Sequence, residues 1–291
     1  GDYRFLERFL DVTKANLFFA HGVLIVEGDA EAILLPVLAR LIGRDLTEHG
    51  VSIVNVGGTG LRRFSRIFQR YNDDTPKIDI PVACLADMDV MPDCAPKILG
   101  LVKDDDDQKW NNSARRWKVV RDFGDNNETR NKALVVQRQR LKQNDGQSVQ
   151  TFVADHWTLE YDLAHSGLAE QVFTAAVLAK NDDPLNAEKK KREDVLVDAT
   201  EEFERLKSNA GDGDDVLCSQ IYRLFHSRAA SKAIAAQYLA ELLLDHCKTK
   251  EIDAAAFRKL LPVYLVDAIE YLTPQPAQEA PTPATDGGDH G

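Results

Sequence analysis

The sequence has few cysteines, no long apolar segment and no excess of positive charge. Its cysteines are Cys84, Cys94, Cys218 and Cys247. They are widely spaced, and no two of them form a C-x-x-C motif. This spacing excludes a zinc knuckle and a disulfide scaffold, and it fits reduced thiols in the cytoplasm. No apolar run approaches the roughly 20 residues of a membrane-spanning helix, so we expect no membrane partner.

The formal net charge of −11 restricts the partners of the chain. A uniformly acidic protein repels nucleic acid, so a DNA contact would need a local basic surface or a metal ion. With 44% hydrophobic and 29% charged residues, the composition is that of a soluble globular protein and excludes a disordered chain. The 291 residues suffice for one large α/β domain or two smaller ones.

Buried strands and helices alternate in the first part of the chain. Continuous apolar and β-branched runs predict strands at residues 23–26, 52–56, 80–86 and 148–154. Helical spacing predicts helices at 3–20, 30–41, 61–71 and 128–143. This order predicts an α/β fold, with a mostly parallel sheet flanked by helices. The segment 91–127 is predicted to be a long loop that holds a short strand at 117–120.

Helical patterns replace strands after residue 158, so we expect an added α-helical domain. The predicted helices lie at 159–180, 186–208, 215–227, 231–246 and 254–272. Asp182-Asp183-Pro184 is one of the predicted breaks between them. The predicted organisation is an α/β catalytic core at 1–160, a helical domain at 161–230, closing helices that pack on the core at 231–272, and a disordered tail at 273–291.

Acidic residues follow three of the predicted strands. They are Glu27 and Glu31 after the first strand, Asp87 and Asp89 after the third, and Glu160 after the last. Because ligands of an open parallel sheet bind at the carboxyl ends of its strands, these side chains are expected to converge. Gly28 is expected to allow a sharp turn, and Asp87 and Asp89 to point to the same side of an extended segment. Converging carboxylates without a positive partner favour a hard divalent cation, Mg²⁺ or Mn²⁺.

A glycine-rich turn and a basic helix face are candidates for DNA contact. The turn Gly57-Gly58-Thr59-Gly60 ends a strand and opens a helix, so its amides can cradle a phosphate. A tight structural turn explains the same residues equally well. Arg62, Arg66 and Arg70 recur at every fourth position of the next predicted helix, where they form either a DNA-binding face or a solvated one.

Taken together, these segments resemble a known family. The runs at 23–28 and 82–89 resemble the TOPRIM fold of topoisomerases, bacterial primases and recombination nucleases. With the segment 54–60 and Thr158-Leu159-Glu160, they resemble the nuclease region of OLD (overcoming lysogenisation defect) proteins. The match is nearest the class related to Gabija phage-defence nucleases, and it covers most of residues 20–272.

The resemblance implies a metal-dependent DNA endonuclease or exonuclease that uses two Mg²⁺ or Mn²⁺ ions. Its implied metal ligands are Glu27, Glu31, Asp87, Asp89 and Glu160, without assignment of an acid to either ion. Glu27 and Lys232 are the implied catalytic residues. Lys232 resembles the family's lysine near the start of a late helix, and a cation there would oppose charge that develops on the phosphate. Arg223 and Arg228 are alternatives for this cation.

The family also implies partners beyond DNA. Gly1-Asp2-Tyr3 leads directly into a helical pattern, as expected of a segment cut from a longer protein. No G-x-x-x-x-G-K-[ST] loop occurs, so the sequence resembles the carboxy-terminal half of the family, without its amino-terminal ATPase domain. A helicase and a second copy of the chain are further partners that fit such a protein.

Two other readings of these residues stay open. The acids could hold a structural ion in a non-catalytic TOPRIM-like module for assembly or DNA binding. Alternatively, Asp87-Met88-Asp89-Val90-Met91 resembles the D-x-D-x-[TV] motif of haloacid-dehalogenase-type phosphatases. In that reading Met91 departs from the motif and Glu27 has no role. We therefore expect the nuclease.

Overall fold

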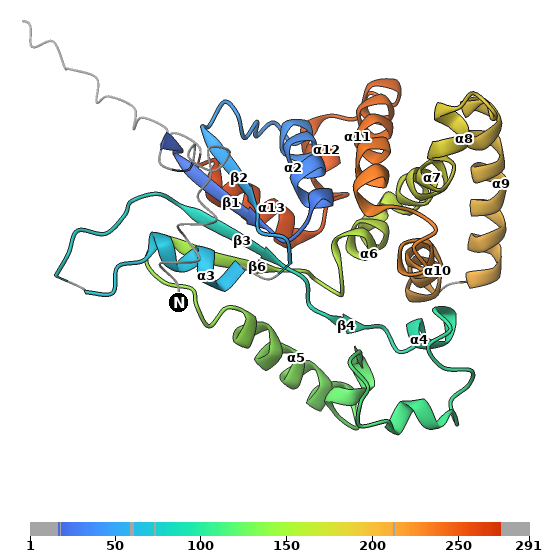
Figure 1. The fold of residues 1–291 in the computed structure, drawn as a ribbon, viewed down its shortest axis with the longest axis horizontal. Helices are drawn as coiled ribbons and strands as arrows, with labels where there is room; N and C mark the ends of the chain where they lie inside the picture. The colour runs from blue at the N-terminus through green and yellow to red at the C-terminus, as the bar shows by residue number, and fades with distance from the viewer. Residues whose placement is uncertain (1–16, 18, 59–60, 73, 212, 275–291) are drawn as a thin grey trace, which may run out of the picture.

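A four-stranded parallel sheet forms the centre of the protein (Figure 1). The computed structural model describes residues 17, 19–58, 61–72, 74–211 and 213–274. The strands are β1 (Gly22–Val26), β2 (Val51–Asn55), β3 (Val82–Ala86) and β6 (Val149–Val153), in the order β2-β1-β3-β6. Leu24 lies opposite Ile53 on one side and Ala83 on the other. The predicted α/β fold with a parallel sheet is therefore confirmed.

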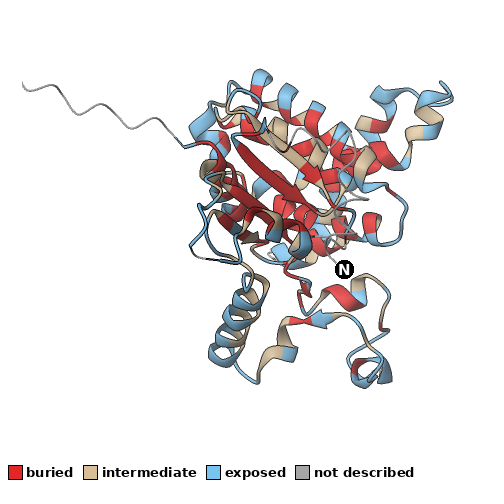
Figure 2. Ribbon diagram, turned by 60° about the vertical axis from the view of Figure 1, so that its left-hand side comes forward, coloured by how far each residue is buried: buried red, intermediate tan, exposed pale blue. Residues whose placement is uncertain are grey.

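Helices cover both faces of this sheet because its central strands are apolar on both sides (Figure 2). On one face, Leu24 and Val26 pack with α2 (Asp29–Leu41) and α13 (Val263–Leu272). On the other, Val23 and Ile25 pack with Phe64 of α3 (Leu61–Ser65). Burying one such side chain contributes about 1.5–3 kcal/mol. The strand ends that carry the acids therefore rest on a rigid core.

Most of the residues after β6 form the predicted α-helical addition. Its helices are α6 (Leu159–Leu163), α7 (Ala169–Lys180), α8 (Asp182–Asn186), α9 (Arg192–Ala210), α10 (Asp214–His226), α11 (Lys232–Thr249) and α12 (Ala254–Arg258). α11 packs against both α2 and α7, so it connects the helical part to the layer that covers the sheet. Across the described ranges, no helix has the length and apolarity that crossing a membrane requires. The domain boundaries stay a prediction.

Several predicted helices have different ends in the structure. The helix at 159–180 is interrupted by a π-helical turn at Ala164–Leu168, where Gly167 has a φ of 124°. The predicted break after residue 180 is confirmed, since α7 ends at Lys180, but Asp182-Asp183-Pro184 themselves form the first turn of α8, where proline's missing N–H is tolerated. The helix at 254–272 is divided before Pro262, since a residue preceding proline disfavours helical geometry.

The two ends of the chain lie largely outside the described residues. Nearly all of the predicted helix at 3–20 and residues 275–291 of the predicted tail belong to this part. Thr273, the first residue of the predicted tail, is instead buried. Its carbonyl oxygen accepts a hydrogen bond from Arg44 Nη1 at 2.8 Å. The ordered structure therefore extends beyond the predicted boundary.

Most of the predicted long loop folds into a small lobe, by which we mean residues 90–123. Its elements are β4 (Val90–Met91), α4 (Ala95–Ile98), the 3₁₀ turn η3 (Gln108–Asn111), β5 (Lys118–Val119) and the 3₁₀ turn η4 (Val120–Phe123). β4 and β5 pair in parallel, which confirms the short strand predicted at 117–120. From the lobe, α5 (Asn127–Leu141) runs back toward the sheet (Figure 1). None of the residues of α5 is buried. The prediction of a loop for the rest of this segment is wrong. Elements as short as the two-residue strand β4 show no hydrophobic periodicity in the sequence, so they could not be recognised.

Candidate metal centre

Acidic side chains from separate segments line one cavity at the carboxyl edge of the sheet. This cavity of about 390 Å³ is lined by Glu27 after β1, Glu31 in α2, Asp87 after β3 and Glu160 in α6. Asp89 lines an adjoining cavity of about 340 Å³, to which Glu27 and Asp87 also contribute. The structure thus brings together the five acids that the sequence singles out. Parallel strands make this convergence possible, because their carboxyl ends lie at the same edge.

The turn between β1 and α2 places Glu31 beside Gly28. The chain bends at Glu27 and Gly28, as predicted, but Gly28 has a φ of −145° and a ψ of 173°, an extended conformation that any residue adopts. The glycine instead leaves space, because a Cβ at this position would lie 3.0 Å from Glu31 Oε2. The neighbouring Asp29 accepts a hydrogen bond from Asn55 Nδ2 at 2.6 Å. Asp29 is therefore held by β2, and the carboxylates on either side of it face the cavity.

The segment after β3 presents its two aspartates differently from the prediction. Asp89 has a φ of 56°, so the chain is in the left-handed region there and the expected extended segment ends before it. This conformation is uncommon for residues other than glycine and is enriched at functional sites. Asp87 and Asp89 both line the cavity of about 340 Å³, Asp87 also lines the cavity that contains Glu160, and Asp89 is exposed beside the lobe.

Burial raises the pKa values of four of these carboxyl groups, and for three of them the charges of neighbouring acids add to the increase. Burial, together with the charges of Asp89 and Glu31, raises the pKa of Glu27 from 4.5 to about 7. Burial likewise raises the pKa of Asp87 well above its usual range, and Glu160 adds to this increase. The pKa values of Glu31 and Asp89 are also raised, mainly by desolvation. A site that collects this much uncompensated negative charge favours a bound cation.

Lys232 provides part of the missing positive charge. Its Nζ lies 2.8 Å from Glu160 Oε2, and Glu160 is only 9% exposed. Burial disfavours the lysine's charge, but Glu160, Tyr222 and Asp87 outweigh burial and raise its pKa. Ser231 caps α11 by accepting a hydrogen bond from the backbone N–H of Ile234 at 3.4 Å, which fixes the start of the helix beside the acids.

The loop before Glu160 is held by a buried aspartate that has no counterpart in the sequence prediction. Asp162 accepts hydrogen bonds from the backbone N–H groups of His156 at 3.1 Å and Trp157 at 3.0 Å. Burial raises its pKa to about 6, although these two hydrogen bonds oppose the increase. Asp162 therefore positions the start of α6, and with it Glu160.

Replacing Asp162 with alanine is expected to destabilise the fold by about 1–3 kcal/mol, because two buried N–H groups lose their acceptor. Thermal unfolding should show a melting temperature several degrees below that of the wild type. Asp162→Asn, which keeps one acceptor oxygen, should lose less. An Asp162→Ala variant that melts with the wild type would contradict this role.

The donor set suits a hard divalent ion, since it consists of carboxylate oxygens. Within the described ranges, however, no three His, Cys, Asp or Glu side chains are arranged around a single point. Mg²⁺ is commonly held by one or two carboxylates, with water and substrate phosphate oxygens completing its coordination. The residues present therefore fit an ion that shares its ligands with solvent and substrate.

The predicted phosphate-binding elements are placed only in part. Gly57 and Gly58 have φ values of 63° and 80°, which favour glycine, and an added Cβ at either would meet open space. Gly58 lines both cavities beside the acids. Thr59, Gly60 and the side chain of Arg62 lie outside the described part of the structure.

The predicted basic face does not extend along a single helix. α3 ends at Ser65, and the 3₁₀ turn η2 (Arg66–Phe68) follows it. Arg66 is exposed, whereas Arg70 lies beyond both turns and donates to Pro76 O at 3.3 Å. The four-residue repeat is therefore wrong as a structural pattern. Instead Arg63, which is out of phase with that repeat, lines the cavity beside Glu27, Asp87 and Asp89.

Comparison with known proteins identifies the first part of the chain. Residues 18–89 match the family model for the overcoming lysogenization defect protein-like TOPRIM domain. This segment contains Glu27, Glu31, Asp87 and Asp89. No curated protein matches the chain. The resemblance stated from the sequence is thus confirmed for this domain.

Solved structures similar to the chain include carboxy-terminal regions of two bacterial proteins. The C-terminal region of the Burkholderia pseudomallei OLD protein is 20% identical, with a TM-score of 0.46, over 88% of this chain and 98% of that chain. The C-terminal region of the Xanthomonas campestris pv. campestris OLD protein is 20% identical, with a TM-score of 0.45, over 88% of this chain and 95% of that chain.

Proposed function

Residues 18–89 form an OLD-like TOPRIM domain, and from this premise we propose that the chain is a divalent-metal-dependent DNA nuclease. It is the nuclease part of a larger, ATPase-linked protein of the cytoplasm. The observation that carries the proposal is the convergence of Glu27, Glu31, Asp87 and Glu160 on one cavity, with Asp89 beside it. These acids come from separate segments of the chain and line adjoining cavities at the carboxyl edge of the sheet.

The five acids are the residues that would hold Mg²⁺ or Mn²⁺. Bound divalent ions stabilise charge during phosphodiester hydrolysis, and a pair of them can serve the attacking and the leaving oxygen. The pKa of Glu27, about 7, means that this carboxyl of the metal-free site is partly protonated near neutral pH. Metal binding and proton release are therefore coupled at this site.

Other residues of the cavity act on the DNA phosphate. Lys232 keeps its charge, because Glu160 and Asp87 stabilise it, and can oppose negative charge that develops on the phosphate. The Gly57–Gly58 turn carries no side chains that would block the approach of a backbone to the acids. Thr59, Gly60, Arg62 and Arg66 remain candidates for contacts further along the DNA.

A plasmid assay tests this function. The wild type is expected to nick or linearise supercoiled plasmid in Mg²⁺ or Mn²⁺, and EDTA should abolish the activity. Asp87→Asn should reduce cleavage by about 100-fold or more, because it removes a carboxylate from the centre of the cluster. Asp198→Asn, which removes one exposed acid from α9, is the matched control and should cleave like the wild type.

The outcome also separates the nuclease from the alternative of a non-catalytic module with a structural ion. Such a module would bind metal through the same acids and gain thermal stability from it, but it would cut DNA under no metal. Cleavage that persists unchanged in Asp87→Asn would show that the activity resides elsewhere and would overturn the proposal.

A further inference from the structure

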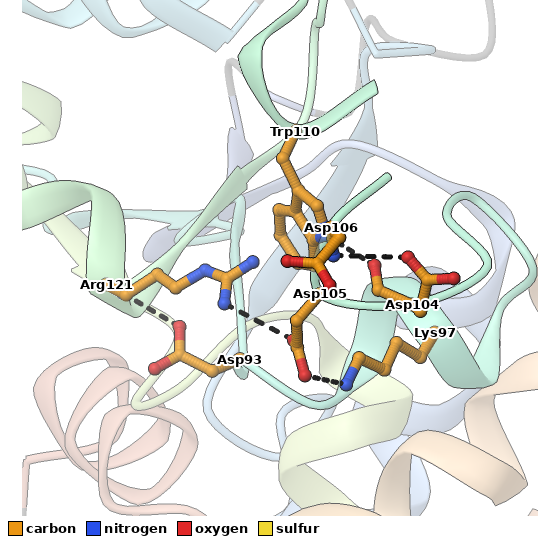
Figure 3. A network of polar contacts seen from close by, with 7 residues as sticks. All are labelled: Asp93, Lys97, Asp104, Asp105, Asp106, Trp110 and Arg121. Carbon is orange, nitrogen blue, oxygen red and sulfur yellow. Dashed lines mark hydrogen bonds and ion pairs between the residues drawn. The ribbon is translucent and has the colours of Figure 1, made fainter. Parts of the chain in front are cut away.

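Ion pairs within the lobe neutralise some of its charged residues. Asp105 forms ion pairs with Lys97 and with Arg121, the latter at 3.7 Å (Figure 3). Arg121 also stacks over Trp110, with its Cζ atom 3.5 Å from the ring centroid. The backbone N–H of Arg121 donates to Asp93 at 2.8 Å. Asp105 of the acidic run at 104–107 is thus paired within the lobe.

Two neighbouring basic residues of the lobe are used in opposite ways. Arg115 donates to Asp122 Oδ2 at 2.6 Å and lies over the Trp117 ring at 4.3 Å, so it is a structural residue. Arg116 and Lys118 are exposed, and neither has a hydrogen bond or ion pair with any residue that the structure describes. These two cations are available to a ligand.

The alternation of a strand explains this division. Successive side chains of an extended segment point to opposite sides. Trp117 and Val119 point into the small core of the lobe, where Val119 is fully buried and packs with Trp110. Lys118 precedes Val119 in β5 and points to the opposite, outward side, and Arg116 is exposed two residues before it. The packing of the lobe therefore leaves the positive charges of Arg116 and Lys118 together on its exposed surface.

Strand pairing places this outward side next to the acids. In the β4–β5 pair Lys118 lies opposite Val90, the residue that follows Asp89. Consistent with this position, the charge of Lys118 counteracts the rise in the pKa of Asp89. A cavity of about 510 Å³ extends from Asp89 along Arg116 and Lys118, and its wall also contains Gln137 of α5 and His226 of α10.

We propose that this cavity holds the DNA backbone on one side of the cleaved bond, with phosphates bound by Arg116 and Lys118. The inference rests on the proposed nuclease function and extends its substrate site into the lobe. The cavity that contains Arg63 also reaches Asp89, but from the sheet. A DNA strand therefore crosses the acids between two cationic flanks, which a chain of net charge −11 needs in order to attract DNA at all.

The test measures binding separately from cleavage. Affinity for a fluorescein-labelled DNA duplex is measured by fluorescence anisotropy between about 50 and 200 mM salt, in Mg²⁺. All proteins carry Asp87→Asn, so that the duplex stays intact. Arg116→Ala/Lys118→Ala is expected to weaken binding about 10-fold or more at the lowest salt. It should also reduce the slope of log affinity against log salt by about 2, one for each lost phosphate contact.

Two further variants make the result specific. Lys248→Ala/Lys250→Ala removes the same charge from the exposed end of α11 and is expected to leave affinity and slope unchanged. Arg116→Lys/Lys118→Arg keeps both charges and should bind like the parent. Melting temperatures of all variants should agree, since the replaced side chains are exposed.

The proposal is overturned if the parent does not bind the duplex, if both alanine pairs behave alike, or if the charge-conserving pair fails to restore binding. Failure of the nuclease itself looks different. In that case the wild type cuts plasmid in neither Mg²⁺ nor Mn²⁺, while the binding difference between the two alanine pairs can still be measured.

Discussion

Replacing Glu27 with glutamine is expected to abolish cleavage and, in the absence of metal, to make the protein more stable at pH 8. Glu27 has a pKa of about 7 in the fold instead of 4.5, because burial and the charges of Asp89 and Glu31 disfavour its ionised form. An ionised Glu27 therefore destabilises the metal-free fold. Glutamine has a similar shape and carries no charge, so it removes that penalty.

The sign of the pH dependence follows from proton binding. Between pH 4.5 and 7 the folded protein binds more protons at Glu27 than the unfolded chain does. Stability therefore falls as the pH rises through this window, and the full penalty is present above pH 7. Since Glu27 is only half-buried, the shift must be discounted for solvent screening, which leaves about 1–2 kcal/mol. This corresponds to a gain of a few degrees in melting temperature.

Differential scanning calorimetry in EDTA at pH 5 and pH 8 measures this effect. The advantage of Glu27→Gln over the wild type should be small at pH 5 and larger at pH 8. Glu204→Gln, on the exposed side of α9, is the matched control and should show no such difference. Adding Mn²⁺ should raise the melting temperature of the wild type more than that of Glu27→Gln. A destabilised Glu27→Gln variant would mean that the carboxylate supports the fold.

Much of the cluster of acids could be predicted from the sequence, because all strands of a parallel sheet end at the same edge. Buried runs such as 23–26 and 82–86 identify strands without knowledge of their partners. Residues directly after such strands then lie at one edge of the sheet. Glu27, Asp87 and Glu160 are therefore neighbours in space although long segments separate them in the sequence.

The details that were missed depend on contacts that no local pattern encodes. The left-handed conformation of Asp89 and the two-residue pair of β4 and β5 arise from packing of the lobe. The ion pair of Glu160 with Lys232 joins residues 72 positions apart. Nothing in the sequence distinguishes Arg115 from Arg116. The small core around Trp110 decides that Arg115 is held within the lobe and that Arg116 is exposed.

Replacing Lys232 with methionine is expected to reduce cleavage about 100- to 1,000-fold, as the loss of one charge-stabilising group does in other sites. Unlike Glu27→Gln, it should also destabilise the metal-free protein. Lys232 Nζ is 2.8 Å from Glu160 Oε2, and Glu160 is buried beside Asp87. Breaking a buried pair costs about 3–5 kcal/mol. Because the lysine side chain is 43% exposed, we expect about 1–3 kcal/mol here.

Calorimetry of a double-mutant cycle isolates this pair. Glu160→Gln in the Lys232→Met background should recover most of the lost stability, because the carboxylate that lacks a partner is then neutral. The coupling free energy between the two positions should be about 1 kcal/mol or more. Lys232→Arg, which keeps the charge, should retain most of the stability of the wild type.

The opposite signs of the two variants follow from one cause, an excess of negative charge at the sheet edge. If this is correct, Mn²⁺ should stabilise Lys232→Met more than the wild type, because a bound cation replaces the missing positive charge beside Glu160. A Lys232→Met protein that is as stable as the wild type in EDTA, or that gains nothing extra from Mn²⁺, would show that Lys232 does not balance the charge of the acids.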